Sequence, residues 1–90
     1  MAIVLFAGEL RRLINDKDEV TIKAGNIEEC IDILEKNFSG VKDLVYDKNG
    51  ELADSINIYI NGDNIRDLNG VGSSLKETDE VNIMTGFAAG

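Results

Sequence analysis

Apolar and polar positions along the chain follow two different spacings, and these predict the order of strands and helices. The segment 55–60 alternates polar and apolar residues and carries its isoleucines on one side, which is typical of a strand with one buried face. A strong hairpin-turn signal, Asn61-Gly62-Asp63, follows it. Other strand-like segments either alternate in the same way or are short runs rich in β-forming residues. We therefore predict strands at residues 2–7, 19–23, 55–60 and 80–84, with a short edge strand near 64–66.

One segment carries the apolar spacing of an amphipathic helix. Asn26 can cap its start, and Glu29 lies three residues later, as in a capping box. The apolar positions that follow recur every three or four residues and share one helical face, namely Ile27, Cys30, Ile31, Leu34 and Phe38. Ser39-Gly40 predicts the end of this helix. A short second helical turn is expected at 41–45, and a helical turn or loop at 9–14.

The predicted order is strand, strand, helix, strand, short strand, strand. A single amphipathic helix has to cover one sheet, because each element must bury its apolar face against another. A compact arrangement places the first and last strands side by side in the middle, with the helix packed diagonally on one face. The sequence therefore predicts an α+β protein of the β-grasp (ubiquitin-like) class, with a mixed four- to five-stranded sheet. We expect residues 1–84 to form this domain and residues 85–90 to form a flexible C-terminal tail.

Composition narrows the range of functions. The formal net charge of -8 argues against nucleic acid as a partner, because a phosphate backbone requires clustered Lys and Arg. The chain has no histidine, which is the commonest general base and metal ligand, and its one cysteine, Cys30, is expected in the core. We therefore expect no enzyme, no cofactor and no metal. No apolar run is long enough to span a bilayer and no secretion signal is evident, so we expect a cytoplasmic protein without a membrane partner.

The last residues are small and uncharged. Glycine has no Cβ and lets another backbone approach closely, so a tail of this composition fits a narrow slot in another protein. Six extended residues span at most ~20 Å, which is enough to reach a site inside a partner. This favours chemistry at the carboxylate of Gly90, with Phe87, Ala88 and Ala89 threading the partner's site. A merely frayed terminus is the alternative.

Strand alternation also predicts an apolar surface on the side of the sheet away from the helix. If the isoleucines of the third predicted strand face the helix, Tyr59 faces away from it. The same reasoning turns Ile3 and Leu5 inward, and it leaves Phe6 and Met84 outside. Contiguous exposed apolar surface usually marks a binding site, so we predict that Phe6, Tyr59 and Met84 bind a partner. A covering loop, or a register shifted by one residue, would remove this surface.

Four blocks of sequence are informative together. They are Phe6-Ala7 with the run at 10–13, the run at 58–66, the run at 75–83, and the small-residue tail that ends in Gly90. Over nearly the whole chain, these blocks resemble the MoaD/ThiS family of ubiquitin-like sulfur carrier proteins. The segment 42–55 makes the chain look more like MoaD-type or cysteine-biosynthesis carriers than like the shorter ThiS type.

The resemblance implies that this chain is a carrier protein, and a possible small subunit of a synthase, and that it is not itself a catalyst. An E1-like (MoeB/ThiF-type) activating enzyme with ATP would adenylate Gly90, and sulfur from a persulfide would replace AMP to leave a thiocarboxylate. The carrier would then dock on a synthase large subunit (MoaE-type) or another sulfur acceptor, with molybdopterin biosynthesis as the expected destination. This chain departs from the family pattern in having Ala89 where a penultimate glycine is usual, and in having no proline.

Other functions are compatible with the same residues. A ubiquitin-like protein modifier would use the same adenylated terminus, but it would be attached to lysines of target proteins. A carrier for thiamine or cysteine biosynthesis would share the whole activation cycle and differ only in the sulfur acceptor. In a plain interaction module the tail would be inert.

Overall fold

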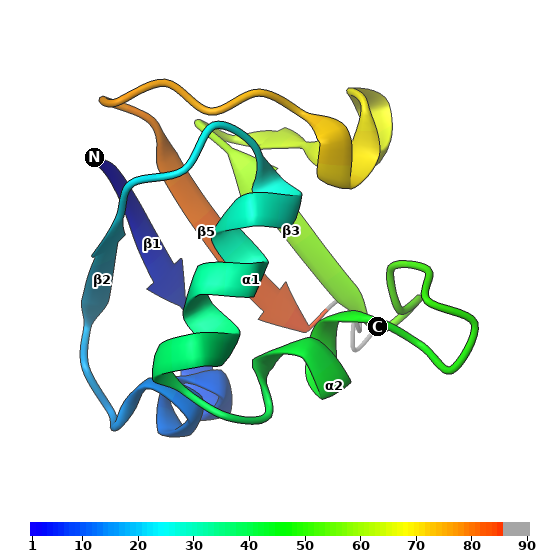
Figure 1. The fold of residues 1–90 in the computed structure, drawn as a ribbon. Helices are drawn as coiled ribbons and strands as arrows, with labels where there is room; N and C mark the ends of the chain where they lie inside the picture. Colours follow the sequence, from blue (N-terminus) through cyan, green and yellow to red (C-terminus); the bar gives the residue numbers. More distant parts are fainter. Residues whose placement is uncertain (86–90) are drawn as a thin grey trace.

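The computed structural model describes residues 1–85, except for the side chain of Glu9, and the predicted tail residues 86–90 lie outside the described part. Within residues 1–85, five strands form one sheet, which is accompanied by two α-helices and three 3-10 helices (Figure 1). The strands are β1 (Ala2–Phe6), β2 (Glu19–Ile22), β3 (Ile56–Ile60), β4 (Asp63–Asn64) and β5 (Glu80–Thr85). The α-helices are α1 (Ile27–Asn37) and α2 (Val41–Val45), and the 3-10 helices are η1 (Gly8–Ile14), η2 (Ile65–Asp67) and η3 (Gly70–Gly72).

The first and last strands lie side by side in the middle of the sheet, as predicted. The strand order is β2-β1-β5-β3-β4. β1 and β5 run parallel, whereas the other neighbouring strands are antiparallel. β5 extends to Thr85, one residue further than predicted, because Thr85 still pairs with Ile56 of β3. The sheet is therefore mixed and five-stranded, and α1 crosses one of its faces (Figure 1).

The core lies between α1 and the sheet. The helix buries the apolar face predicted from its spacing, with Ile27, Cys30, Ile31 and Leu34 all 1% exposed or less. The sheet contributes alternate residues of β1, β3 and β5, namely Val4, Phe6, Ile56, Ile58, Ile60, Val81 and Ile83. The opposite face of the sheet carries the other set of alternate residues of these strands.

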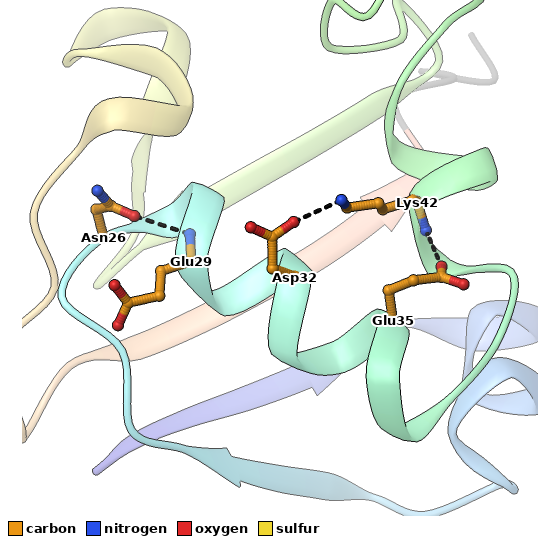
Figure 2. Close-up of polar contacts among 5 residues, drawn as sticks. All are labelled: Asn26, Glu29, Asp32, Glu35 and Lys42. Atoms are coloured by element: carbon orange, nitrogen blue, oxygen red, sulfur yellow. Dashed lines mark hydrogen bonds and ion pairs between the residues drawn. The ribbon is translucent and has the colours of Figure 1, made fainter.

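The start of α1 is fixed by the predicted cap. The side-chain Oδ1 of Asn26 accepts a hydrogen bond from the backbone N–H of Glu29 at 2.8 Å (Figure 2). The Glu29 carboxylate in turn accepts the backbone N–H of Gly25 at 3.1 Å, one residue before the cap. Such reciprocal capping satisfies N–H groups that the first helical turn leaves without partners, and an N-cap is worth about 1 kcal/mol.

Polar contacts tie α2 to α1. The Lys42 ammonium lies 2.6 Å from the Asp32 carboxylate, and the Glu35 carboxylate accepts the Lys42 backbone N–H at 2.8 Å (Figure 2). Hydrogen bonding to Asp32 raises the pKa of Lys42. The turn between the helices passes through Gly40, whose φ of 102° favours glycine. These contacts hold the start of α2 against α1.

The edge of the sheet differs from the prediction. We expected a short strand near 64–66, but β4 contains only Asp63–Asn64 and the chain then turns into η2. The reason is local, because the Asn64 side chain accepts the backbone N–H of Arg66 at 2.9 Å and so starts the 3-10 turn. The strand order and the placement of the main helix are those of the predicted β-grasp. Within residues 1–85, no helix has the length and apolar character needed to cross a membrane.

Candidate functional site

The end of β5 is the base from which the predicted tail continues. Thr85 pairs with Ile56 on one side, and the backbone N–H of Ala7 donates to the Ile83 carbonyl at 3.0 Å on the other. The last described residues are therefore held between β3 and the end of β1 (Figure 1). The tail residues predicted to act, Phe87, Ala88, Ala89 and Gly90, lie outside the described residues. What the structure shows is the paired strand end that precedes them.

A shallow hollow lies next to this base. Its lining includes Ala7, Gly8, Leu10 and Thr85. Gly8 has a φ of 54°, a backbone conformation that glycine adopts without strain, and it turns the chain from β1 into η1. The hollow thus lies where β1 and β5 end, and because these two central strands are parallel, both end at the same end of the sheet.

The open face of the sheet carries part of the predicted apolar surface. Tyr59 and Met84 are half-buried and belong to the alternate set that points away from α1, as predicted. Leu5 is half-buried and Ile3 is 38% exposed on the same side. Their binding role stays a prediction, but the surface itself exists and adjoins the base of the tail.

The predicted exposure of Phe6 is wrong. Phe6 is 3% exposed and pairs with Ile83, which also points into the core. Val4 behaves likewise, so the inward set of β1 is the one we had placed outside, and Ile3 and Leu5 lie on the open face instead. The physical reason is that neighbouring residues paired across parallel strands point to the same side, so the register with β5 fixes the phase of β1. The apolar surface therefore contains Leu5 in place of Phe6.

Amide side chains interrupt the apolar surface. In one row across the sheet, Asn82 lies between Leu5 and Tyr59. In the next row, towards the tail, Asn57 lies beside Met84. This face is therefore an apolar surface interrupted by amide side chains at positions fixed by the strand register.

Asn57 is part of a polar cluster that the sequence did not reveal. Its Oδ1 accepts hydrogen bonds from Arg66 Nη1 at 2.5 Å and from Asn64 Nδ2 at 3.3 Å. Arg66 Nη2 also donates to the Ala53 carbonyl at 2.8 Å. A possible signal was the alternation in β3, which places Asn57 outward beside the edge strand that leads to Arg66.

Cys30 does not belong to this surface. It is 1% exposed in the core, as expected, and burial raises the pKa of its thiol to about 12. A thiol with that pKa is protonated at neutral pH, and the thiolate is the reactive form. Among the described side chains, which exclude those of Glu9 and of residues 86–90, no group of three or more His, Cys, Asp or Glu is arranged to hold a metal ion.

The fold and the open face define a class of protein. One mixed sheet, with its first and last strands central and one main helix across it, is the ubiquitin-like β-grasp architecture. The chain belongs to the ThiS family, whose model matches residues 4–90 and so includes the tail. This confirms the resemblance seen in the sequence blocks.

Individual relatives agree with this assignment. The sulfur carrier protein CysO of Mycobacterium tuberculosis (strain ATCC 25618 / H37Rv) is 28% identical over 83 residues, which are 90% of this chain and 89% of that protein. A chain in the crystal structure of the Amycolatopsis orientalis BexX/CysO complex matches with a TM-score of 0.91 at 26% identity, over 100% of both chains. Small archaeal modifier protein 1 from Methanosarcina acetivorans matches with a TM-score of 0.85 at 28% identity, over 99% of this chain and 95% of that one.

Proposed function

We propose that this chain is a sulfur carrier protein whose working group is the carboxylate of Gly90. The observation that carries the proposal is the family match, which runs to residue 90 and so includes the tail. This tail continues from β5, which is paired with β1 on one side and with β3 on the other. The similarity to proteins named sulfur carrier protein CysO supports it. In this account the folded domain is the part that other proteins bind, and the chain is a substrate of enzymes that act on its C-terminus.

The chemistry proceeds in two displacements. A carboxylate oxygen of Gly90 attacks the α-phosphorus of ATP, pyrophosphate leaves, and an acyl adenylate remains. A sulfur nucleophile then attacks the carbonyl carbon and AMP leaves. Sulfide gives the thiocarboxylate directly, whereas a persulfide gives an acyl disulfide, which a thiol then cleaves to the thiocarboxylate with formation of a disulfide. The product is a thiocarboxylate. Because Cys30 is buried with a pKa near 12, it is not the sulfur nucleophile, and the sulfur comes from outside this chain, as sulfide or as the persulfide of a partner.

The proposed partners follow from this chemistry. An E1-like (MoeB/ThiF-type) activating enzyme supplies the ATP site, and a sulfur acceptor consumes the thiocarboxylate. The open face with Leu5, Tyr59 and Met84 is the proposed docking surface, because it is the apolar face next to the base of the tail. The similar Amycolatopsis chain comes from a BexX/CysO complex, which supports docking on another protein.

The pathway that we propose for the sulfur differs from the one expected from the sequence. The sequence alone placed molybdopterin biosynthesis with a MoaE-type subunit first. The similarity to carriers named CysO favours the alternative that we had kept open, a carrier for cysteine biosynthesis. Incubating the thiocarboxylate form with a cysteine precursor or with the molybdopterin precursor, each with its synthase, distinguishes the two by which product contains the sulfur.

Adenylation is tested by ATP–pyrophosphate exchange with the E1-like activating enzyme of the same cells. The wild-type chain is expected to support exchange, and a chain lacking Gly90 is expected to lose it. The shortened chain ends in Ala89 and keeps all described residues, so it is a matched control for folding. If exchange is equal with both chains, the proposal is wrong and an inert tail is favoured.

A second function, protein modification, has its own support. Small archaeal modifier protein 1 is 28% identical to this chain over nearly the full length of both. A modifier would use the same adenylate but form an isopeptide bond between Gly90 and a lysine of a target. Mass spectrometry of material from cells distinguishes the functions, because a thiocarboxylate changes the terminus whereas modification yields branched peptides.

A further inference from the structure

Arg66 occupies a fixed position on the open face that the proposed function does not yet use. Its Nη1 donates to Asn57 Oδ1 at 2.5 Å and its Nη2 donates to the Ala53 carbonyl at 2.8 Å. Its backbone N–H is held by the Asn64 side chain at 2.9 Å. The guanidinium is therefore anchored at two nitrogen atoms, although the residue is exposed.

The anchoring oxygens are neutral, so the charge of Arg66 is not compensated by them. A guanidinium has five N–H donors in a planar fork, and the described contacts use two. The chain has 17 Asp and Glu against 9 Lys and Arg, so carboxylates are plentiful. Yet among the side chains that the structure describes (residues 1–85 without Glu9), the ion pairs are those of Arg11 with Asp18 and of Lys42 with Asp32, and neither includes Arg66.

The position of Arg66 restricts what it can bind. Asn57 pairs with Met84, and the adjacent Ile56 pairs with Thr85, so the guanidinium lies beside the base of the tail. Five further residues in extended conformation reach up to about 17 Å beyond Thr85. A nucleotide at the Gly90 carboxylate of an extended tail is thus far from Arg66. The ligand that fits Arg66 is a group on the partner's surface at the entrance of its slot.

We propose that Arg66 is a specificity-determining residue that binds a carboxylate of the activating enzyme at this entrance. The inference rests on the proposed function and names the chemistry of its partner. Arg pairs with carboxylate bidentately, which fixes geometry, and a guanidinium that is already anchored loses little conformational freedom on binding. The carrier as a whole, at -8, attracts basic surface. One carboxylate of the enzyme opposite Arg66 therefore sets the orientation of the carrier on the enzyme. In any other orientation that carboxylate would face carboxylates of the carrier and repel them.

The simpler alternative is that Arg66 only ties the loop at Ala53 to β3. That role predicts a loss of thermal stability without a specific change in recognition. The two roles are separable by replacing either the charge or its anchor. Arg66→Gln removes the charge, whereas Asn57→Ala removes an anchoring oxygen and leaves the charge in place.

The experiment is ATP–pyrophosphate exchange by the E1-like activating enzyme of the same cells, at varied carrier concentration, with thermal melting of each variant. Arg66→Gln is expected to raise KM about tenfold with kcat unchanged, as expected for loss of a charge-assisted hydrogen bond. Added salt should reduce the difference in KM between the wild-type chain and Arg66→Gln, because salt screens the charge interaction. Lys36→Gln, an equal charge change in the last turn of α1, is the matched control and should leave KM unchanged. Arg66→Lys should give an intermediate KM, since an ammonium lacks the planar fork.

The inference is overturned if Arg66→Gln and Lys36→Gln have the same KM. It is also overturned if Asn57→Ala raises KM as much as Arg66→Gln, because the effect then belongs to the anchored loop. If Arg66→Gln does not fold, the KM of Arg66→Lys decides, and a value equal to wild type contradicts the inference. Failure of the wild-type chain to be adenylated removes the proposed function as well. Normal wild-type exchange with an unaffected Arg66→Gln removes this inference alone.

Discussion

The side-chain amide of Asn61 donates a hydrogen bond to the Asp79 carboxylate at 2.9 Å, and this contact joins the turn after β3 to the residue before β5. The second Asp79 oxygen accepts the backbone N–H of Lys76 at 2.8 Å, and Asn61 Oδ1 accepts the backbone N–H of Glu80 at 2.9 Å. Asn61 itself has a φ of 51°, which asparagine tolerates better than most residues. The first residue of β5 is thus positioned by two of the sequence blocks that indicated the family.

Asp79 should give the folded protein a specific pH dependence. The Lys76 backbone N–H, and then the Asn61 amide, lower the pKa of Asp79 in the folded state. A folded pKa below the unfolded value of about 3.9 means that the charged form stabilises the fold above about pH 4, and that this contribution is lost as the pH falls through the lowered pKa. Asp79→Asn should cost about 1–2 kcal/mol at pH 7, since its amide would place a donor against another donor.

Urea denaturation at pH 7 and near pH 3 checks this prediction. The difference between wild type and Asp79→Asn should shrink at the lower pH. Glu77→Gln, at an exposed neighbouring position, removes one carboxylate and should show little change at either pH. A constant difference between Asp79→Asn and wild type across this range would contradict the assignment.

The two faces of β1 should separate stability from docking. Phe6→Ala should lower the free energy of unfolding by about 3–5 kcal/mol, because Phe6 is buried against the core. Leu5→Gln, one residue away on the open face, should change unfolding little but raise the KM for the activating enzyme. Denaturation curves and exchange kinetics measure both effects. A stable Phe6→Ala variant with impaired docking would restore the original prediction for Phe6.

The Cys30 thiol should be inert in the folded protein. With a pKa near 12 and 1% exposure, it should not react with a thiol reagent at pH 8 until denaturant is added. Cys30→Ala should still form the thiocarboxylate, because the proposed chemistry uses only the terminus. Rapid labelling of the native chain, or loss of thiocarboxylate formation in a folded Cys30→Ala variant, would show that this thiol takes part.

Ala89 should be a tolerated departure from the usual penultimate glycine. Replacing it with glycine removes one methyl group, and a group of that size is worth about 0.8 kcal/mol when buried. Ala89→Gly should therefore change kcat/KM for adenylation by less than about fourfold. A much larger gain would show that Ala89 fits the partner's slot poorly, and that the activating enzyme assayed is not the natural one.

The sequence predicted best those elements whose pattern has an unambiguous period. The spacing of Ile27, Cys30 and Leu34 and the cap at Asn26 located α1, because helix period and capping chemistry agree there. The alternation in β3 located Tyr59 on the open face for the same reason. Placing the first and last strands together followed from having one helix to cover one sheet.

Other features depend on contacts that no local pattern contains. β1 is apolar at every position, so alternation could not decide whether Val4 and Phe6 or Ile3 and Leu5 face the core. The parallel register with β5 decides it, and that register is a tertiary property. The contact of Arg66 with Asn57 likewise depends on how η2 folds back over the edge of the sheet.

Mapping the sulfur onto the chain tests the central claim most directly. The wild-type chain is incubated with ATP, the activating enzyme and sulfide, then digested, and the C-terminal peptide is identified by mass spectrometry. The account predicts replacement of one oxygen by sulfur at Gly90, and no such peptide from the chain that lacks Gly90. Sulfur found at another residue, or an unchanged terminus with an enzyme shown to exchange pyrophosphate on this chain, would contradict it.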